Sequence, residues 1–129
     1  KWYRTSAMQG EASGQSNLGY MYQHGLGVQK NNFESVKWYR KSAQQGYASG
    51  QANLGYMYQF GYGVGIDYYE SVRLYGLASE QGDAAGQSNL GYMYQNGYGV
   101  FKDYEKAVKI IEIMALEFKI LGEYKNGRI

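Results

Sequence analysis

The chain contains no cysteine, no proline and only one histidine, His24. The absence of cysteine excludes disulfides, thiolate metal sites and cysteine nucleophiles. Without a cysteine or a second histidine, the usual Ser-His-Asp, Cys-His and zinc constellations cannot be assembled. His24 stands beside Gly25 at an expected helix end, where a surface position is the better interpretation. We therefore expect no enzymatic activity, no metal site and no cofactor.

Long apolar runs and a strong charge of either sign are also absent. The 129 residues include 13 Lys or Arg and 11 Asp or Glu, which gives a formal net charge of +2. That balance argues against binding nucleic acid or an acidic membrane through bulk charge. No apolar run approaches the ~20 residues that cross a bilayer, and residues 1–5 do not resemble a signal peptide. We expect a soluble chain with no nucleic-acid partner and no membrane insertion, and the compartment stays open.

Glycine, with 19 copies, and tyrosine, with 16, are abundant and recur at a fixed spacing. The segment QSNLGYMYQ occupies residues 15–23 and 87–95, and QANLGYMYQ occupies residues 51–59, so that consecutive copies begin 51 − 15 = 36 residues apart. A fixed period of this size predicts a stacked repeat protein. We divide one array, residues 1–129, into repeats 2–37, 38–73 and 74–109 and a divergent C-terminal helix within 110–129. Because residue 1 falls inside a repeat, we expect a piece of a longer array.

Two kinds of glycine break divide each repeat into two helices. Single glycines stand where a left-handed C-terminal cap is expected, at Gly10, Gly46 and Gly82. Gly-x-Gly-Val loops end the other helices at residues 25–28, 61–64 and 97–100, and their valines should reach the core. These loops are not phosphate cradles, since they follow helices and lack the third glycine. In the loop at 61–64, we expect a positive φ at Gly61 or Gly63.

Polar residues after the Gly-x-Gly-Val loops predict helix starts. Asn31-x-x-Glu34 and Asp67-x-x-Glu70 resemble capping boxes, and Asp103 keeps only the capping residue. Together with the glycine breaks, they predict helices at residues 11–24, 32–45, 47–60, 68–81, 83–96 and 104–121, with residues 1–9 as the end of a further helix. In the capped helix at 32–45, the apolar set Val36, Tyr39 and Ala43 has the spacing of a buried stripe. Its basic residues, Lys37, Arg40 and Lys41, should point to solvent.

The helix that carries the repeated segment presents two different faces. An α-helix turns about 100° per residue, so Tyr56 lies on the side opposite the inward-pointing Leu54. Glycine costs roughly 1 kcal/mol in a helix interior, so its recurrence implies close helix contacts at Gly14, Gly19, Gly50, Gly55, Gly86 and Gly91. We expect hydrogen bonds between repeats from Asn17, Asn53 and Asn89. The face around Tyr56 is assigned to the concave side of a curved stack, and it comprises Ser13, Ser16, Tyr20, Gln23, Ser49, Ala52, Tyr56, Gln59, Ala85, Ser88, Tyr92 and Gln95.

The last 20 residues depart from the repeat. Phe118 occupies the position that Gly46 and Gly82 hold in earlier repeats, so we expect the helix to continue through Leu121, with Gly122 as its cap. This helix is unusually apolar, and a helix that is apolar all round needs cover on more than one side. We expect it to pack against another copy or to fold over the terminal repeat, unless the last hairpin alone buries it.

The motif N-L-G-x-M-Y-x-x-G-x-G-V, followed by D-Y-x-x-x-V and W-Y-R-K-S-A-x-Q-G, resembles the Sel1-like repeat, a relative of the tetratricopeptide repeats. The resemblance covers residues 1–109. It implies an all-α fold, a right-handed α/α superhelical solenoid of helical hairpins. It also implies a non-enzymatic scaffold or adaptor, and by analogy with tetratricopeptide domains the concave face would hold a protein or an extended peptide. Some cysteine-rich relatives are associated with penicillin binding, but their paired cysteines are absent here.

Three functions therefore remain open. A scaffold that binds a peptide or partner protein is supported by the tyrosine, serine and glutamine residues of the concave face. A purely structural or idealised array without a dedicated ligand is supported by the near-identity of the three copies, because a groove usually varies along its ligand. A penicillin-binding or β-lactamase-like activity is supported only by the family resemblance.

Overall fold

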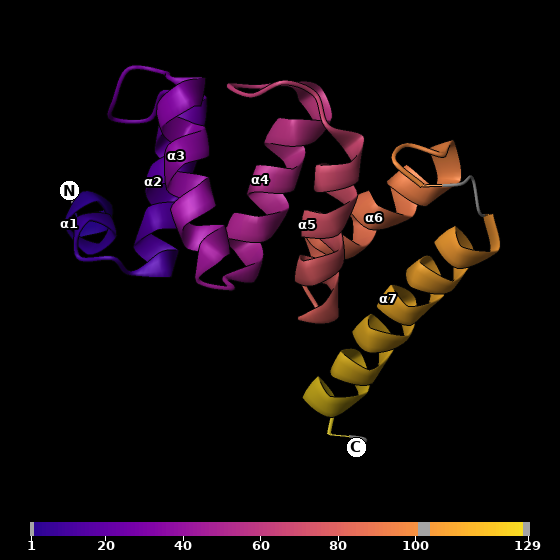
Figure 1. Ribbon diagram of the computed structural model, residues 1–129. Coiled ribbons are helices and arrows are strands. Elements are labelled where there is room, and N and C mark those ends of the chain that lie inside the picture. Colours follow the sequence, from indigo (N-terminus) through magenta and orange to yellow (C-terminus); the bar gives the residue numbers. More distant parts are fainter. Residues whose placement is uncertain (1, 101–103, 128–129) are drawn as a thin grey trace.

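The computed structural model describes residues 2–100 and 104–127. The described residues form seven helices and no strand, in agreement with the predicted all-α class. The helices are α1 Trp2–Met8, α2 Ala12–His24, α3 Asn32–Gln44, α4 Ala48–Phe60, α5 Tyr68–Glu80, α6 Ala84–Asn96 and α7 Tyr104–Lys125. The first six lie side by side as successive hairpins of a solenoid (Figure 1). The glycine breaks and polar start signals therefore located α2 to α6 to within one residue at each end.

The helices form two layers, and neighbouring helices are closer together in one layer than in the other. Each helix packs on the next one in the chain, and α2 also contacts α4, which in turn contacts α6. Within the described residues, α3 and α5 have no comparable contact. The layer that carries the repeated segment is therefore the more tightly spaced one.

Helices α3 and α5 begin at the predicted capping residues. Asn31 Oδ1 accepts a hydrogen bond from the Glu34 backbone N–H at 3.1 Å, and Asp67 Oδ1 accepts one from Glu70 at 3.0 Å. The backbone N–H of Asn31 donates to the Tyr22 carbonyl at 2.8 Å rather than to a capping-box carboxylate. The cap residue therefore also joins the loop to α2. Asp103, the third predicted cap, lies outside the described residues.

The cap of α6 was not anticipated from the sequence. Asp83 Oδ2 accepts a hydrogen bond from the Gly86 backbone N–H at 2.8 Å, as a helix N-cap does. The corresponding residues before α2 and α4 are Glu11 and Tyr47, and neither makes a side-chain cap. The third copy of this helix therefore starts with a hydrogen bond that the other two lack.

Glycines with positive φ end the helices of the repeated segment, as predicted. In the loop after α4, φ is 71° at Gly61 and 72° at Gly63. At Gly63 the backbone also passes close to the start of α3, because a Cβ there would stand 2.4 Å from the Asn32 carbonyl oxygen. This loop therefore needs glycine for its conformation and for contact with the preceding repeat.

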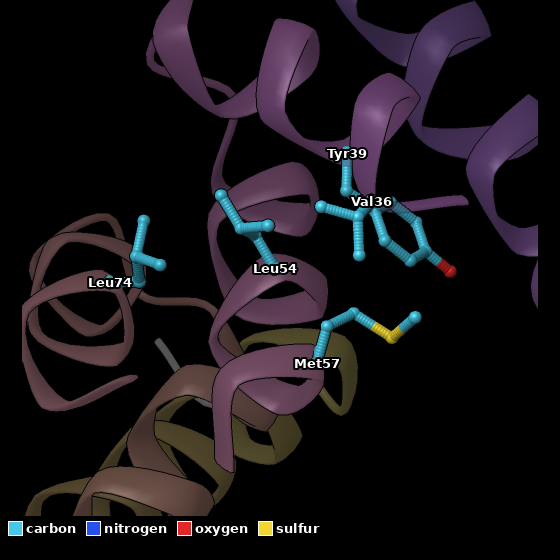
Figure 2. Packing of buried hydrophobic residues seen from close by; sticks show 5 residues of the cluster. All are labelled: Val36, Tyr39, Leu54, Met57 and Leu74. Atoms are coloured by element: carbon cyan, nitrogen blue, oxygen red, sulfur yellow. The ribbon is translucent and has the colours of Figure 1, made fainter. Parts of the chain in front are cut away.

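The core lies between the two layers and crosses the repeat boundary. Its largest cluster joins Val36 and Tyr39 of α3 to Leu54 and Met57 of α4 and to Leu74 of α5 (Figure 2). The predicted loop valine of this repeat, Val64, packs against the same cluster. One apolar core therefore spans consecutive hairpins, as a stacked repeat requires.

The same three contacts, made by four residues, join α2 to α3 and α4 to α5, and we call this set the hairpin clasp. In the first hairpin, a Cβ on Gly19 would lie 2.6 Å from the Tyr39 ring, so the ring rests directly on the glycine backbone. Ser35 Oγ donates to the Gly19 carbonyl at 2.8 Å, and the Tyr39 hydroxyl donates to Gln23 Oε1 at 2.7 Å. The second clasp repeats these contacts with Gly55, Ser71, Tyr75 and Gln59.

The third hairpin lacks the clasp. Ala107 and Ile111 stand in α7 at the positions that serine and tyrosine hold in α3 and α5. A Cβ on Gly91 would have its nearest neighbours at 3.9 Å, and the Ile111 side chain is 55% exposed. Helix α7 is therefore packed on α6 less closely than α3 is on α2.

Arg40 does not point away from the protein as expected. Its guanidinium donates to the Tyr58 hydroxyl at 2.8 Å and lies 5.5 Å from the Tyr58 ring centroid. The aliphatic part of an arginine side chain is long enough to cross to a neighbouring helix while its charge stays hydrated. Lys37 and Lys41 are exposed, as predicted, and both ammonium groups lie over the Trp38 ring.

The predicted end of the last helix was wrong. Helix α7 continues to Lys125, so Gly122 lies inside the helix rather than at its cap, and Gly127 has the positive φ of 74°. Phe118, which replaces the repeat glycine, is 64% exposed. The long helix runs obliquely beyond the hairpins toward the C-terminus (Figure 1).

Alanine substitutions at Gly19 and Gly91 test the clasp in a matched sequence context. Gly91→Ala should raise the free energy of unfolding by roughly 0.5–1 kcal/mol, because alanine is the better helix former and space is available. Gly19→Ala should lower it by about 1–3 kcal/mol, because the methyl group collides with the buried Tyr39 ring. Urea unfolding followed by circular dichroism measures both, and equal effects of the two substitutions would contradict the clasp.

The clasp tyrosines should make stability fall at alkaline pH. Burial raises the pKa of the Tyr39 and Tyr75 phenols above the ordinary value. The unfolded chain loses these protons above pH ~10 while the folded chain keeps them, so this stability is fully present below pH 10 and decreases as the pH rises further. In urea unfolding from pH 8 to 11.5, the double variant Tyr39→Phe, Tyr75→Phe should be less stable at pH 8 and lose less stability on alkalinisation. Tyr69→Phe is the control at an exposed tyrosine, and an unchanged pH dependence in the double variant would contradict the prediction.

Candidate binding face

The tyrosines of the predicted face are its most accessible large side chains. Tyr20, Tyr56 and Tyr92 are 49%, 37% and 47% exposed, whereas Leu54 on the opposite side of α4 is 2% exposed. In the third repeat Ala85, Ser88 and Gln95 are also exposed. In the first two repeats Ser13, Gln23 and Ser49 are partly buried. The helical geometry therefore placed the tyrosines on the correct side of each helix.

Three residues expected on this open face are buried, namely Ser16, Ala52 and Gln59. Ser16 lies between α2 and α4, where its Oγ is 3.4 Å from Ser49 Oγ and 3.5 Å from Asn53 Nδ2. The expected role of Asn53 in bonding between repeats is confirmed by the second of these contacts. Ser16 and Ala52 are covered because neighbouring helices of this layer approach each other, which the geometry of one isolated helix does not reveal.

The glutamines of the face hold the clasp in the first two repeats. Gln23 Oε1 and Gln59 Oε1 each accept the hydroxyl hydrogen of a buried tyrosine, at 2.7 and 2.6 Å. Gln95 occupies the same place in the repeated segment, but Ile111 offers it no hydroxyl group. Its exposed amide therefore remains accessible from the surface, whereas the side-chain oxygen atoms of Gln23 and Gln59 are engaged in the clasp.

Each exposed tyrosine belongs to a separate local aromatic contact. Tyr20 lies 4.2 Å from the His24 ring, and Tyr56 lies 4.7 Å from Phe60 and 6.1 Å from Tyr62, between ring centroids. Tyr92 lies 6.0 Å from Tyr98. Among the described residues, the three tyrosines make no ring contact with one another. They therefore form a row of separate rings, with one exposed tyrosine in each repeat.

The aromatic residues of the Gly-x-Gly loops were missed as members of this face. Tyr62 and Tyr98 occupy the variable position between the two glycines, and both reach tyrosines of the repeated segment. The available signal was that tyrosine recurs at this turn position 36 residues apart. A large aromatic side chain that recurs in a turn indicates that the ring packs against a neighbouring residue. The surface is therefore more aromatic than the helix alone indicated.

Two hollows lie along the row. One of about 220 Å³ lies between the first and second copies of the repeated segment and includes Gln23 and Tyr56 in its wall. The other, of about 450 Å³, lies between α6 and α7 and is lined by Ser88, Tyr92, Gln95, Ile111, Met114 and Ala115. Five members of the expected set therefore border the two hollows, namely Gln23, Tyr56, Ser88, Tyr92 and Gln95.

The accessible groups of this face are aromatic rings, hydroxyl groups and amides. Within the part of the chain that the structure describes, no group of three or more His, Asp or Glu side chains could hold a metal ion. The same residues include no helix that is both long and apolar enough to cross a membrane. Aromatic rings flanked by hydroxyl and amide groups can supply apolar contact and hydrogen bonds at low cost in side-chain entropy.

Comparison with known proteins adds the family. The Sel1 repeat family model matches residues 12–47, 48–83 and 84–116, so its third unit includes the first part of the divergent C-terminal segment. A search of curated proteins finds no match.

Two solved structures resemble the chain in sequence and in fold. A Sel1 repeat protein from Oxalobacter formigenes is 40% identical over 90% of this chain and 48% of its own, with a TM-score of 0.81. A protective antigen of uropathogenic Escherichia coli that displays an SLR fold is 36% identical over 98% of this chain and 28% of its own, with a TM-score of 0.86. The present chain thus spans less than half the length of either protein. With three matched units and this shared architecture, the chain belongs to the Sel1 repeat family, whose all-α solenoids commonly serve as scaffolds for protein interactions.

Proposed function

We propose that this chain is a non-enzymatic scaffold that binds an extended peptide or a segment of a partner protein along the face of α2, α4 and α6. The observation that carries the proposal is the row of half-exposed tyrosines, Tyr20, Tyr56 and Tyr92, with one ring in each repeat. Helices in contact are spaced by about 10 Å. A ligand that contacts all three rings must therefore be extended, which suits a polypeptide and not one small molecule.

The spacing of the layers supports a concave shape for this face. Helix α4 contacts both α2 and α6, whereas α3 and α5 of the described residues do not make a comparable contact. When one layer of a stack is more closely spaced than the other, the stack curves toward the closer layer. Curved repeat arrays use such surfaces for extended ligands.

Burial reduces the proposed binding set. Ser16, Ala52 and Gln59 are enclosed between helices and serve packing. The residues that we retain for ligand contact are Ser13, Tyr20, Gln23, Ser49, Tyr56, Ala85, Ser88, Tyr92 and Gln95. The alternative of a purely structural array gains support from the same burial, so the experiment must separate the exposed rings from the structural contacts.

Peptides selected from a displayed random library on the intact chain provide the ligand for that test. Each single replacement Tyr20→Ala, Tyr56→Ala and Tyr92→Ala should leave the circular dichroism spectrum unchanged and weaken peptide binding at least fivefold by calorimetry, because each removes one apolar station. Binding should change little between 50 and 300 mM salt, since these contacts are uncharged.

The matched control is Tyr69→Ala, which removes a tyrosine that is 78% exposed on α5, outside the face. It should leave peptide affinity unchanged. Selected peptides that bind all three tyrosine variants as tightly as the native chain would support the purely structural array instead.

We further propose that α7 mediates contact with a second copy of the chain. Its exposed apolar side chains are Val108, Ile111, Ile113, Leu116, Phe118, Ile120, Leu121 and Tyr124. Exposures between 48% and 70% show that the last hairpin alone does not cover this helix. Exposed apolar side chains in this number on one helix are typical of an interaction site.

Sedimentation velocity at increasing protein concentration tests the second proposal. The native chain should associate reversibly in the micromolar range, and the double variant Ile113→Glu, Leu116→Glu should remain monomeric because the introduced charges oppose burial. Phe33→Glu changes a side chain that is 77% exposed on α3 and should associate like the native chain. A native chain that stays monomeric at all concentrations would refute contact between copies.

A further inference from the structure

The three repeats are not equivalent beside the Gly-x-Gly loops, although their loop backbones follow the same path. Asn32 and Tyr68 are separated by 68 − 32 = 36 residues and occupy the same position at the start of α3 and α5. The loop glycine of the next repeat approaches both equally, since a Cβ would stand 2.4 Å from the Asn32 carbonyl oxygen at Gly63 and 2.6 Å from the Tyr68 carbonyl oxygen at Gly99. The difference between the two places therefore lies in the side chains.

Tyr68 fills its place with an aromatic ring. It stacks on Tyr98 of the following loop, with ring centroids 4.9 Å apart and planes inclined by 23°. Asn32 has no aromatic ring. Tyr62, the counterpart of Tyr98, stacks instead on Phe60, with ring centroids 5.8 Å apart. Space that an aromatic pair fills between the second and third repeats is therefore left open between the first and second.

The opened space is the hollow of about 220 Å³, and its wall is polar. It is lined by Gln23, His24, Lys30, Asn32, Tyr56 and Tyr62. Pockets for drug-sized ligands occupy about 300–1,000 Å³. The hollow is smaller, and it suits the end of one residue of a larger ligand.

Asn32 lines this hollow and carries an unsatisfied acceptor. Its Oδ1 atom is buried and has no hydrogen-bond donor. Buried polar groups are nearly always hydrogen-bonded, and leaving one unsatisfied is unfavourable. A ligand that supplies an N–H group here would remove that cost, whereas an anion without a donor would face the carbonyl dipole.

Lys30 and His24 define the other half of the ligand. No carboxylate of the described residues forms an ion pair with Lys30. One lysine and one histidine suit a single negative charge, since phosphate recognition usually employs clustered arginines. Tyr56 and Tyr62 form the aromatic part of the wall. The complementary group combines a carboxylate with a neighbouring amide N–H.

We propose that this hollow is a subsite for a carboxylate-bearing residue of a peptide, whose carboxylate faces Lys30 and whose amide N–H donates to Asn32 Oδ1. Two kinds of residue have this chemistry: the last residue of a chain with its free carboxylate, and an internal aspartate. The subsite rests on the proposed function in that Tyr56 belongs both to the hollow and to the row that holds the remainder of the peptide.

Small peptides titrated into the 15N-labelled chain at millimolar concentration test the subsite by NMR. The probes are N-acetyl-trialanine with a free carboxylate, its C-terminal amide, N-acetyl-aspartyl N-methylamide and N-acetyl-phosphoserine N-methylamide. One or both carboxylate probes should shift the side-chain amide resonances of Asn32, with an affinity at least tenfold above that of the uncharged amide. The first and third probes distinguish a chain terminus from an aspartate.

Two substitutions remove the subsite in different ways. Asn32→Tyr installs the residue found at the equivalent position 68 and should fill the hollow while the fold is retained. Lys30→Gln removes the charge and keeps a polar side chain. Both should lower the affinity for the carboxylate probes at least tenfold, and Lys37→Gln, on the exposed face of α3, should not.

The results separate this subsite from the tyrosine row. Equal binding of the acid and the uncharged amide, preference for the phosphoserine probe, retention of binding in Asn32→Tyr, or no binding of any probe would each overturn the subsite. Selected long peptides whose affinity falls on replacement of Tyr20 or Tyr92 but is unchanged in Asn32→Tyr would support binding along the tyrosine row and refute the subsite. If the carboxylate probes bind but the affinity of long peptides does not depend on the tyrosine row, the subsite is supported and the row is refuted.

Discussion

The contact between a tyrosine ring and a bare glycine backbone is the constraint on which each complete hairpin depends. Only a residue without a Cβ lets the Tyr39 ring lie against Gly19 and the Tyr75 ring against Gly55. The serine and glutamine hydrogen bonds then fix the orientation of the ring and satisfy its buried hydroxyl group. The helix accepts a residue with poor helix propensity because the ring fills the space that a side chain would take.

This constraint also decides which face remains for function. In each complete hairpin the tyrosine of the second helix, Tyr39 or Tyr75, is buried at the interface between the two helices. The tyrosine of the first helix, Tyr20 or Tyr56, stays at the surface. Structural and exposed tyrosines thus alternate between the layers in the same repeat. The third hairpin, which has isoleucine in place of the buried tyrosine, exposes both the face and its last helix.

Much of this architecture could be read from the sequence, because the period, the glycine breaks and the capping residues act locally. The exposure of Tyr56 followed from its angular separation from Leu54. The burial of Ser16, Ala52 and Gln59 did not, since it depends on how closely the next helix approaches. Gly122 was misjudged because an internal glycine costs a helix only roughly 1 kcal/mol, which does not end a helix that continues with good helix formers such as Glu123 and Lys125. The open space at Asn32 depends on the ring of a loop residue in the next repeat, which no local pattern reveals.

The hydrogen bonds between repeats have a consequence for how such chains change length. Gln45 donates to Gln15 and Gln81 donates to Gln51, each across 30 residues, and Asn53 donates to Ser16 across 37 residues. Each of these three bonds thus connects neighbouring units of the array. Duplication or loss of one whole unit would keep the glutamine pairing at a new junction, because Gln15 and Gln51 occupy equivalent positions, as do Gln45 and Gln81. Insertion of a few residues inside a unit would disrupt it. A change in length by whole units of 36 residues is therefore compatible with the stacking of this array.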